Sequence, residues 1–312
     1  MNKDISIVVP VYNEEENILS FLTRVVAILE KCKFSYEIIF VLDPSIDRSE
    51  EIISNQIKLN KNIKMLVMSR RFGQPSATMA GILNCNGRTC VIIDVDLQDP
   101  PELIENMYFK FQEGYDVVLA KRISRQGETF IKKIVTKIGY RIINYASDIE
   151  IPNDTGDFRL ISRRVVDHLR QLNEPHNFLR GLVSYIGFKQ CFIEYNRDSR
   201  YSGNSKYNPF FGSIKIALNG LISFSSKPLY LMTGVGFFLS IFSFFLGFWY
   251  FIQKILGVDI TPGLPTNVLL ITFFSGIQLL ALGLIGEYVG RIYDQVKQRP
   301  SYIIEKKINF DE

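Results

Sequence analysis

A mostly parallel, doubly wound α/β sheet is the fold class predicted for the first part of this chain, and three observations predict it. Strand-like runs recur over residues 5–11, 37–43, 63–69, 90–96 and 116–122. The runs are almost continuously apolar, as expected for strands that are covered on both faces. Helical patterns separate them, and this alternation is typical of parallel strands joined by crossover helices.

Capping signatures predict where two of the helices begin. Asn13 follows the first strand-like run, and Glu16 comes three residues later, a spacing that predicts a capping box. The stretch "DPPE" places Asp99 at a cap position, prolines behind it and Glu102 in the first turn. We therefore expect Asp99 and Glu102 to cap a helix over residues 100–112.

The C-terminal third contains two long runs without a charged residue, Pro228–Gln253 and Ile260–Gly286. Each exceeds the roughly 20 apolar residues that a helix needs to cross a bilayer. We predict a two-helix transmembrane hairpin over 227–290. Lysines and arginines cluster outside the hairpin, so the positive-inside rule predicts a multi-pass protein of the inner (cytoplasmic) membrane with both termini in the cytoplasm.

Sequence patterns around the hairpin divide the rest of the chain. Residues 1–205 are predicted to form the cytoplasmic domain, 206–226 a juxtamembrane amphipathic helix, and 291–312 a cytoplasmic C-terminal tail. A second amphipathic pattern covers 130–146. We expect both amphipathic segments to lie on the membrane surface, with a core helix as the alternative for 130–146. The chain begins directly with a strand-like run, so we expect no signal peptide.

Charge is distributed unevenly along the chain. Residues 1–119 carry 12 basic and 17 acidic side chains, whereas 120–215 carry 17 basic and 9 acidic ones. The basic middle segment predicts an anionic partner such as a phosphate or an acidic membrane surface. We expect no nucleic acid, because no basic and aromatic motif of a nucleic-acid binder is present. The four cysteines and two histidines have no metal-site spacing.

Polar side chains follow the predicted strands at the edge where doubly wound sheets bind ligands. They are Tyr12, Asn13, Glu14, Asp43, Arg70, Arg71, Asp94, Asp96, Lys121 and Arg122. No GxGxxG follows the first strand and no GxxxxGK[ST] occurs, which excludes the common dinucleotide-binding and P-loop enzymes.

Asp94 and Asp96 stand two residues apart at the end of a predicted core strand. On an extended strand they share a face, with Gln98 next in line if the chain stays extended. Neighbouring carboxylates repel each other unless a cation lies between them. Oxygen ligands suit a hard ion, so the pattern predicts Mg²⁺ or Mn²⁺ bound by Asp94, Asp96 and Gln98 together with substrate phosphates.

The ordered motifs "VVPVYNEEENI", "VLDPSIDRS", "SRRFGQPSATMAGI", "DVDLQDPPE", "TGDFRLISRR" and "RYSGNSKY" resemble those of the inverting family 2 glycosyltransferases of GT-A fold. "GLIGEYVGRIYDQVKQRPSYII" resembles the C-terminal signature of their polyprenyl-phosphate branch. That branch includes bactoprenol glucosyltransferases and is related to dolichol-phosphate mannose synthase. The resemblance covers essentially the whole chain. It implies sugar transfer, with inversion, from a nucleotide sugar to undecaprenyl phosphate or another polyprenyl phosphate.

The resemblance also implies roles for individual residues on the donor side. Pro10, Tyr12, Glu14, Asp43 and Asp94 would bind the donor nucleotide, with Asp43 at its base or ribose. Asp94 and Asp96 would meet the donor diphosphate through the metal. Ordinary structural roles stay open for two of them, as a helix-terminal charge for Glu14 and a turn residue for Asp43.

On the acceptor side, Asp157 occupies the family's catalytic acid position, and Asp96 is the second catalytic candidate. A phosphate acceptor is largely ionised at neutral pH, so we expect Asp157 to orient the phosphate or its basic partners more than to take a proton. Arg159 and Arg163 are the residues that could hold it. The acceptor or leaving phosphate would be bound by Arg122, Lys132, Lys133, Arg200, Ser205 and Lys206.

Two departures leave the donor open. The family usually reads Asp-Asp-Gly-Ser where this chain has Leu42-Asp43-Pro44-Ser45, and commonly has Asn where Arg71 stands. We expect UDP-glucose or another UDP-hexose, with GDP-mannose as the alternative. A processive polysaccharide synthase predicts a QxxRW motif, which is missing. A non-catalytic membrane-anchored protein that binds nucleotide sugars predicts loss of the acidic motifs, which are present. The resemblance further implies a homo-oligomer such as a tetramer.

Overall fold

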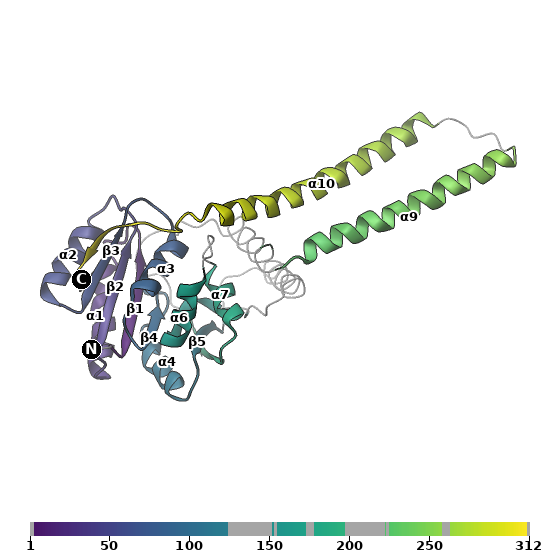
Figure 1. The fold of residues 1–312 in the computed structure, drawn as a ribbon. Coiled ribbons are helices and arrows are strands. Elements are labelled where there is room, and N and C mark those ends of the chain that lie inside the picture. Colours follow the sequence, from purple (N-terminus) through teal and green to yellow (C-terminus); the bar gives the residue numbers. More distant parts are fainter. Residues whose placement is uncertain are drawn as a thin grey trace.

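The computed structural model describes residues 3–123, 152, 155–172, 178–196, 222, 225–257 and 263–310. Figure 1 shows an α/β domain from which two long helices extend. Its elements are β1 (Ile5–Val11), α1 (Ile18–Lys31), β2 (Tyr36–Leu42), α2 (Ser49–Leu59), β3 (Ile63–Met68), α3 (Gln74–Asn84), β4 (Thr89–Ile92), α4 (Leu103–Gln112), β5 (Val117–Arg122), β6 (Thr155–Ser162), α6 (Arg163–Gln171), α7 (Leu179–Ile186), β7 (Gln190–Tyr195), α9 (Lys227–Ile255), α10 (Leu264–Lys297) and β8 (Ile304–Ile308).

The strands form an eight-stranded sheet in the order β7-β5-β6-β4-β1-β2-β3-β8. β1 pairs in parallel with β2 and β4, β2 with β3, and β5 with β7. β6 runs antiparallel between β4 and β5, and β8 runs antiparallel to β3. The prediction of a mostly parallel sheet is therefore confirmed, with the two antiparallel strands as additions.

Helices cover both faces of the sheet, which explains why its central strands are apolar on both sides. On one face, side chains of α1, α2 and α4 such as Phe21 and Met107 pack against the sheet. On the other face, α3, α6 and α7 contribute residues such as Met79, Val166 and Leu182. The two cores hold the strand ends rigidly, so they fix the loops at the carboxyl edge.

The predicted start of the first helix differs from the structure. α1 begins at Ile18 with Asn17 as N-cap, and Asn13 instead adopts a positive φ of 53°. The Asn13 amide N–H donates to Ser45 Oγ at 3.0 Å, and its Oδ1 accepts from the Ile46 N–H at 2.9 Å. Asn13 therefore ties the loop after β1 to the loop after β2, and the predicted capping box is wrong.

The C-terminal strand β8 was not predicted, because residues 291–312 had been assigned to a tail. Met68 of β3 pairs with Ile304, and the Ser69 N–H donates to the Ile303 carbonyl at 3.0 Å. Lys307 also donates to Asn84 Oδ1 at 2.8 Å. The chain thus returns from α10 to the carboxyl end of β3 and extends the sheet there.

Within α9 and α10, the stretches Lys227–Gln253 and Asn267–Lys297 are long and apolar enough to cross a membrane, by length and composition. Neither is buried in the protein, and large apolar side chains such as Phe237, Trp249 and Leu279 are exposed along them. In Figure 1 both helices project away from the α/β domain. The amphipathic segments 130–146 and 206–226 lie outside the described residues, except for Ile222 and 225–226.

Candidate active site

The predicted site residues that the structure describes gather at the carboxyl edge of the sheet. Tyr12 follows β1, Asp43 follows β2, and Asp94 and Asp96 follow β4, all at the same edge because these strands are parallel. β6 runs in the opposite direction and pairs Thr155 with Lys121 at the end of β5. Its first residues therefore bring Asp157 to this edge as well.

Asp43 is a buried carboxylate that holds the loop after β3. Its oxygens accept hydrogen bonds from the backbone N–H groups of Phe72 at 3.1 Å and Gly73 at 2.9 Å. Gly73 has a φ of 89°, a conformation that favours glycine. Asp43 is 2% exposed, so its main visible role is to fix this loop. The predicted contact with a nucleotide base or ribose stays a prediction.

The same loop reaches across to Tyr12 at the end of β1. The Arg71 guanidinium lies 4.0 Å from the centre of the Tyr12 ring, and its Nη1 donates to the Tyr12 hydroxyl at 3.3 Å. A cation over a tyrosine face is attracted by the ring quadrupole. Arg71, which replaces the family's common Asn, thus forms a stacked aromatic and cationic pair at the predicted nucleotide position.

Asp94 and Asp96 are positioned by a turn and not by a strand. β4 ends at Ile92, and Leu97 adopts a positive φ of 58°. The prediction that the two carboxylates share one strand face, with Gln98 in line, is therefore wrong. Asp96, 8% exposed, accepts a hydrogen bond from the Gln98 backbone N–H at 3.1 Å. Asp94 Oδ1 accepts from Gln74 Nε2 at 2.8 Å.

The chemistry of this turn fits a hard divalent cation. Asp94 and Asp96 offer carboxylate oxygens, and the Gln98 side chain offers an amide oxygen. Among the described residues, no group of three or more His, Cys, Asp or Glu side chains could hold a metal by itself. Two carboxylates completed by phosphate oxygens are typical of Mg²⁺ sites in nucleotide enzymes. The oxygen donors therefore suit an ion that arrives with a diphosphate.

Pro10 and Glu14 flank Tyr12 in the chain. Pro10 lies within β1, half-buried, opposite Val41 of β2. The Glu14 N–H donates to Ser49 Oγ at 3.1 Å, and its Oε2 accepts from Asn17 Nδ2 at 2.6 Å. These contacts place Glu14 at the start of α1, close to α2. Its predicted contact with a nucleotide stays a prediction.

Asp157 lies among arginines. Its Oδ1 accepts from Arg180 Nε at 2.9 Å, and Arg159 Nη2 lies 3.8 Å from the same oxygen. Desolvation by the surrounding protein acts to raise the pKa of the Asp157 carboxyl. The positive charges of Arg180, Arg159 and Arg122 outweigh it and hold this pKa below its usual range. Asp157 is thus a stable carboxylate at neutral pH, with its side chain 37% exposed.

The buried Arg159 fixes the backbone around Asp157 through hydrogen bonds. Its Nη2 donates to the Gly156 carbonyl at 2.8 Å, and its Nε donates to the Asp157 carbonyl at 3.3 Å. Burial lowers the pKa of Arg159 to about 10, so it remains charged at neutral pH. Arg163, the other residue expected to hold Asp157, is at the opposite end of β6 and donates to the Gly87 and Cys85 carbonyls. The prediction that Arg163 could hold Asp157 is therefore wrong.

Arg122 belongs to a second polar cluster beside Asp157. Its Nε donates to the Tyr195 hydroxyl at 3.1 Å, and its Nη2 lies 3.6 Å from Asp99 Oδ1. Tyr195 donates in turn to Asp99. Burial and the Asp99 charge raise the pKa of Tyr195 to about 12. A Cβ at Gly156 would come within 2.8 Å of Arg122 Nη2, so a side chain there would displace the guanidinium.

This cluster overturns the expected capping roles of Asp99 and Glu102. α4 begins at Leu103 with Glu102, and not Asp99, as its N-cap residue, and the Glu102 side chain makes no capping hydrogen bond. Asp99 is 2% exposed and is the counter-ion of Arg122. Glu102 instead forms an exposed ion pair with Arg24 at 2.8 Å. The Arg122 side chain keeps 18% of its surface exposed. Its predicted contact with a phosphate stays a prediction.

Three site residues were missed from the sequence, namely Gln74, Arg180 and Tyr195. Each contacts a predicted residue across the fold, over 20 to 96 positions of sequence. Gln74 lies within the family-like motif "SRRFGQPSATMAGI", and Arg180 lies within the basic middle segment, but neither signal predicts the contacts that the side chains make. The predicted phosphate ligands Lys132, Lys133, Arg200, Ser205 and Lys206 lie outside the described residues.

Comparison with known proteins identifies the family of the chain. Residues 6–170 match the family model described as glycosyl transferase family 2. The chain is 44% identical to the Bacillus subtilis glycosyltransferase YkcC over 306 residues, which is 98% of this chain and 94% of that protein. It is 39% identical to the bactoprenol glucosyl transferase of Shigella phage SfII over 302 residues, 97% of each chain.

A solved structure with a similar arrangement is glucosyl-3-phosphoglycerate synthase from Mycobacterium tuberculosis in complex with Mn²⁺, UDP-glucose and phosphoglyceric acid. The TM-score is 0.46 at 16% identity, over 70% of this chain and 78% of that one. The family match covers Tyr12, Asp43, Asp94 and Asp157, together with the strands that they follow or belong to. The predicted GT-A fold and glycosyltransferase class are therefore confirmed, and the chain belongs to glycosyl transferase family 2.

Proposed function

We propose that this protein transfers a hexose from a nucleotide sugar to a polyprenyl phosphate, such as undecaprenyl phosphate, at the cytoplasmic face of the membrane and with inversion at the sugar carbon. The observation that carries the proposal is the convergence of Asp94, Asp96 and Asp157 on one edge of the sheet, the same edge to which the chain returns from α10. Relatives named bactoprenol glucosyl transferase support the lipid acceptor.

The reaction forms one bond and breaks one. A phosphate oxygen of the lipid attacks the anomeric carbon of the sugar, and the bond from that carbon to the donor diphosphate breaks. The nucleoside diphosphate leaves with the electron pair. The acceptor oxygen is already ionised at neutral pH, so no proton has to be removed from it. The protein's task is to hold two anions together and to stabilise the leaving group.

The surroundings of Asp157 favour a positioning role. A carboxylate with a lowered pKa that is already paired with Arg180 is a weak base near neutral pH. The same pairing fixes the direction of the Arg180 guanidinium, whose side chain keeps 25% of its surface exposed. We infer that Asp157 aims Arg180 at the phosphate groups, while the buried Arg159 supports Asp157 from the protein interior. We also infer that Asp157 and Asp96 are the acidic residues the reaction needs.

Asp94 and Asp96, with Gln98 as a further oxygen donor, would hold a divalent ion such as Mg²⁺ or Mn²⁺. When bound, such an ion neutralises charge on the diphosphate and stabilises its departure. Gln74 and the Gln98 backbone orient the two carboxylates toward that task. Pro10, Tyr12, Glu14 and Asp43 remain the proposed nucleotide contacts, and the Tyr12–Arg71 stack supports a planar or anionic ligand there.

The acceptor requires a membrane, and α9 and α10 supply the segments that would cross it. The boundaries 1–205, 206–226, 227–290 and 291–312 stand as proposed units, with β8 of the last one joined to the catalytic sheet. Both termini would be cytoplasmic. The phosphate ligands Arg122, Lys132, Lys133, Arg200, Ser205 and Lys206 and a homo-oligomer, such as a tetramer, also remain proposals.

A donor screen tests this function. Purified full-length protein in lipid nanodiscs is incubated with undecaprenyl phosphate, Mg²⁺ or Mn²⁺, and one labelled nucleotide sugar at a time. We expect label in the lipid fraction with UDP-glucose or another UDP-hexose. Transfer with GDP-mannose alone would identify the alternative donor. A folded protein that binds a nucleotide sugar without transferring it to any lipid would favour the non-catalytic alternative.

A further inference from the structure

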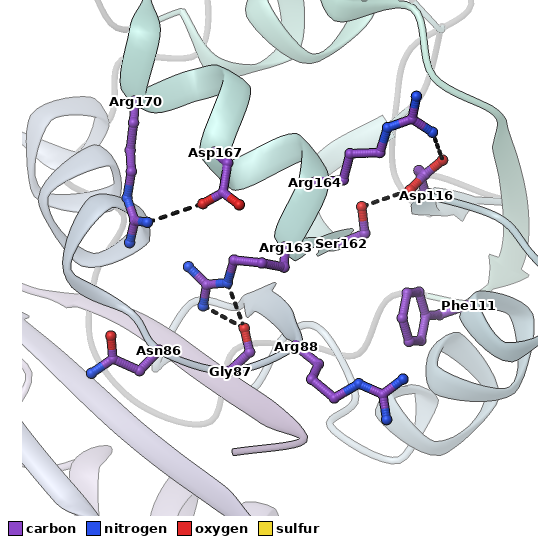
Figure 2. Close-up of a pocket in the computed structure, with 10 residues that line it drawn as sticks. All are labelled: Asn86, Gly87, Arg88, Phe111, Asp116, Ser162, Arg163, Arg164, Asp167 and Arg170. Atoms are coloured by element: carbon purple, nitrogen blue, oxygen red, sulfur yellow. Dashed lines mark hydrogen bonds and ion pairs between the residues drawn. The ribbon is translucent and has the colours of Figure 1, made fainter. Parts of the chain in front are cut away.

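A polar pocket lies at the opposite edge of the sheet from the candidate active site. It has a volume of about 540 Å³ and is lined by Asn86, Gly87, Arg88, Phe111, Asp116, Ser162, Arg163, Arg164, Asp167 and Arg170 (Figure 2). Arg88 immediately precedes β4, whereas Asp94 follows its end. The carboxyl edge, where the chain arrives from α10, is therefore on the other side of the domain.

The wall of this pocket is fixed by a buried network behind it. Glu37 is fully buried and accepts hydrogen bonds from the Asn86 N–H and from Ser6 Oγ, both at 2.6 Å. Ser6 Oγ accepts from the Gly87 N–H at 2.8 Å, and Lys64 pairs with Glu37 at 2.8 Å. The segment 86–88 therefore has a defined conformation before any ligand arrives, which lowers the entropic cost of binding.

Positive charge exceeds negative charge in the lining. Four arginines face two aspartates, a net charge of +2. Arg170 pairs with Asp167 at 3.0 Å, and Arg164 lies 4.0 Å from Asp116. Arg163 donates to the neutral carbonyls of Gly87 and Cys85. Between described residues, no ion pair includes Arg163 or Arg88, although the positive charge of Arg88 helps to lower the pKa of the Asp4 carboxyl.

Two of the guanidinium groups are open to a ligand. Arg88 is exposed, and the Arg164 side chain is 66% exposed and is stacked over Phe188 at 4.1 Å. Arg164 also lies in the first turn of α6, where the helix dipole favours an anion. In the view of Figure 2, Phe111 is drawn between the Arg88 and Arg164 side chains. The pocket therefore offers two charged donors and one apolar surface.

We propose that this pocket binds a soluble phosphorylated small molecule. The phosphate would be held by Arg88 and Arg164, since guanidinium groups bind phosphate through paired, charge-assisted hydrogen bonds. An organic group would lie against Phe111. The volume falls within the usual range for small-molecule sites, roughly 300–1,000 Å³. The distance from the edge where the chain arrives from α10 favours a ligand from solution over a lipid headgroup.

The test uses inorganic pyrophosphate as probe and full-length protein in nanodiscs of neutral lipid. Calorimetry is performed with EDTA present, so that metal-dependent binding at the candidate active site does not contribute. We expect saturable binding by the wild type. The double variant Arg88→Gln/Arg164→Gln should weaken it by about a hundredfold or more, because two groups that make charge-assisted hydrogen bonds are lost. Arg24→Gln, which removes an exposed arginine elsewhere, is the matched control and should bind like the wild type.

Protection from arginine modification gives an independent measurement on the unmutated protein. Phenylglyoxal treatment followed by peptide mass analysis should show Arg88 and Arg164 protected by pyrophosphate, and Arg24 not protected. Equal affinity in the double variant, or absence of protection, would overturn the proposal. Loss of binding in Asp96→Asn would assign the signal to the candidate active site instead. Competition by anionic lipid in the nanodisc would overturn the assignment to a soluble ligand.

Discussion

The Asp157 carboxylate and the Arg180 guanidinium form an ion pair at 2.9 Å, although 23 residues separate them in the chain. Asp157 lies near the N-terminal end of β6, and Arg180 lies in the first turn of α7. Arg159 lies 3.8 Å from the same carboxylate oxygen. The Asp157 carboxylate therefore interacts with two guanidinium groups, and the first two predictions follow from these ion pairs.

Removing either partner of the Asp157–Arg180 pair should reduce sugar transfer strongly. We expect Asp157→Asn and Arg180→Gln each to lower kcat on the order of 100-fold, as for other single groups that stabilise developing charge. The double variant should be little worse than either single variant, because the two residues act as a unit. Lys110→Gln, at an exposed pair with Glu113, is the control. Additive losses in the double variant would contradict the prediction.

The pH dependence distinguishes a positioning carboxylate from a general base. The pKa of Asp157 in the folded protein is below its usual value, which is about 3.9 in peptides. Its ion pair therefore contributes fully above that value and is lost only as the pH falls through the lower folded pKa. Between pH 6 and 8, Asp157→Asn should lower the transfer rate by a constant factor. A factor that shrinks toward pH 6 would indicate a base that titrates in that range.

Asp99 should matter for stability far more than Glu102. Asp99→Asn leaves the mostly buried Arg122 without its counter-ion, which we expect to destabilise the fold by about 3 kcal/mol. Glu102→Gln breaks only an exposed pair with Arg24 and should change stability by less than about 1 kcal/mol.

Thermal unfolding in detergent can be followed with a thiol-reactive dye, since Cys85 and Cys90 are buried and become reactive on unfolding. The expected result is a clearly lower unfolding temperature for Asp99→Asn and an unchanged one for Glu102→Gln. Equal shifts for the two variants would support the capping interpretation instead.

The C-terminal strand should support the donor site. The Ser69 N–H donates to the carbonyl of Ile303, just before β8. The loop that follows Ser69 carries Arg71, which stacks on Tyr12, and Gly73, whose N–H donates to Asp43. Deleting 301–312 should raise the KM for the nucleotide sugar by about threefold to tenfold and change kcat less, because a loosened loop weakens binding. Lys306→Gln, at an exposed pair with Glu50, is the control. An unchanged KM would show that the strand is not needed for the loop.

Most of the central sheet could be predicted because β-branched apolar runs are dictated by burial on both faces. The run 5–11 coincides with β1, the runs 63–69 and 116–122 differ from β3 and β5 by one residue at one end, and the run 37–43 is shifted by one residue from β2. The run 90–96 extends beyond β4 because the apolar Val95 and the acids around it belong to a turn that is packed against the core. Local pattern alone does not separate a buried turn from a strand.

The site was predictable where one motif carries the chemistry and unpredictable where a contact crosses the fold. Asp43 and Asp94 stand out because acids follow predicted core strands, and Asp157 stands out only through the resemblance of its motif to that of the family. Their partners Gln74 and Arg180 are set by tertiary packing, which leaves no periodic trace in the sequence. Asp99 was misassigned because an Asp-Pro-Pro stretch is also a good helix cap. Its burial beside Arg122 and Tyr195 is a property of the assembled sheet.

The central claim is that the lipid phosphate accepts the sugar, and product analysis tests it most directly. Purified protein, undecaprenyl phosphate, a labelled UDP-hexose and Mg²⁺ or Mn²⁺ are incubated, and the lipid fraction is examined by mass spectrometry beside an Asp96→Asn sample. The account predicts a lipid heavier by one hexose unit, formed only with metal and only by the unmutated protein. Release of free hexose without a glycosylated lipid, or an equal yield from Asp96→Asn, would contradict it.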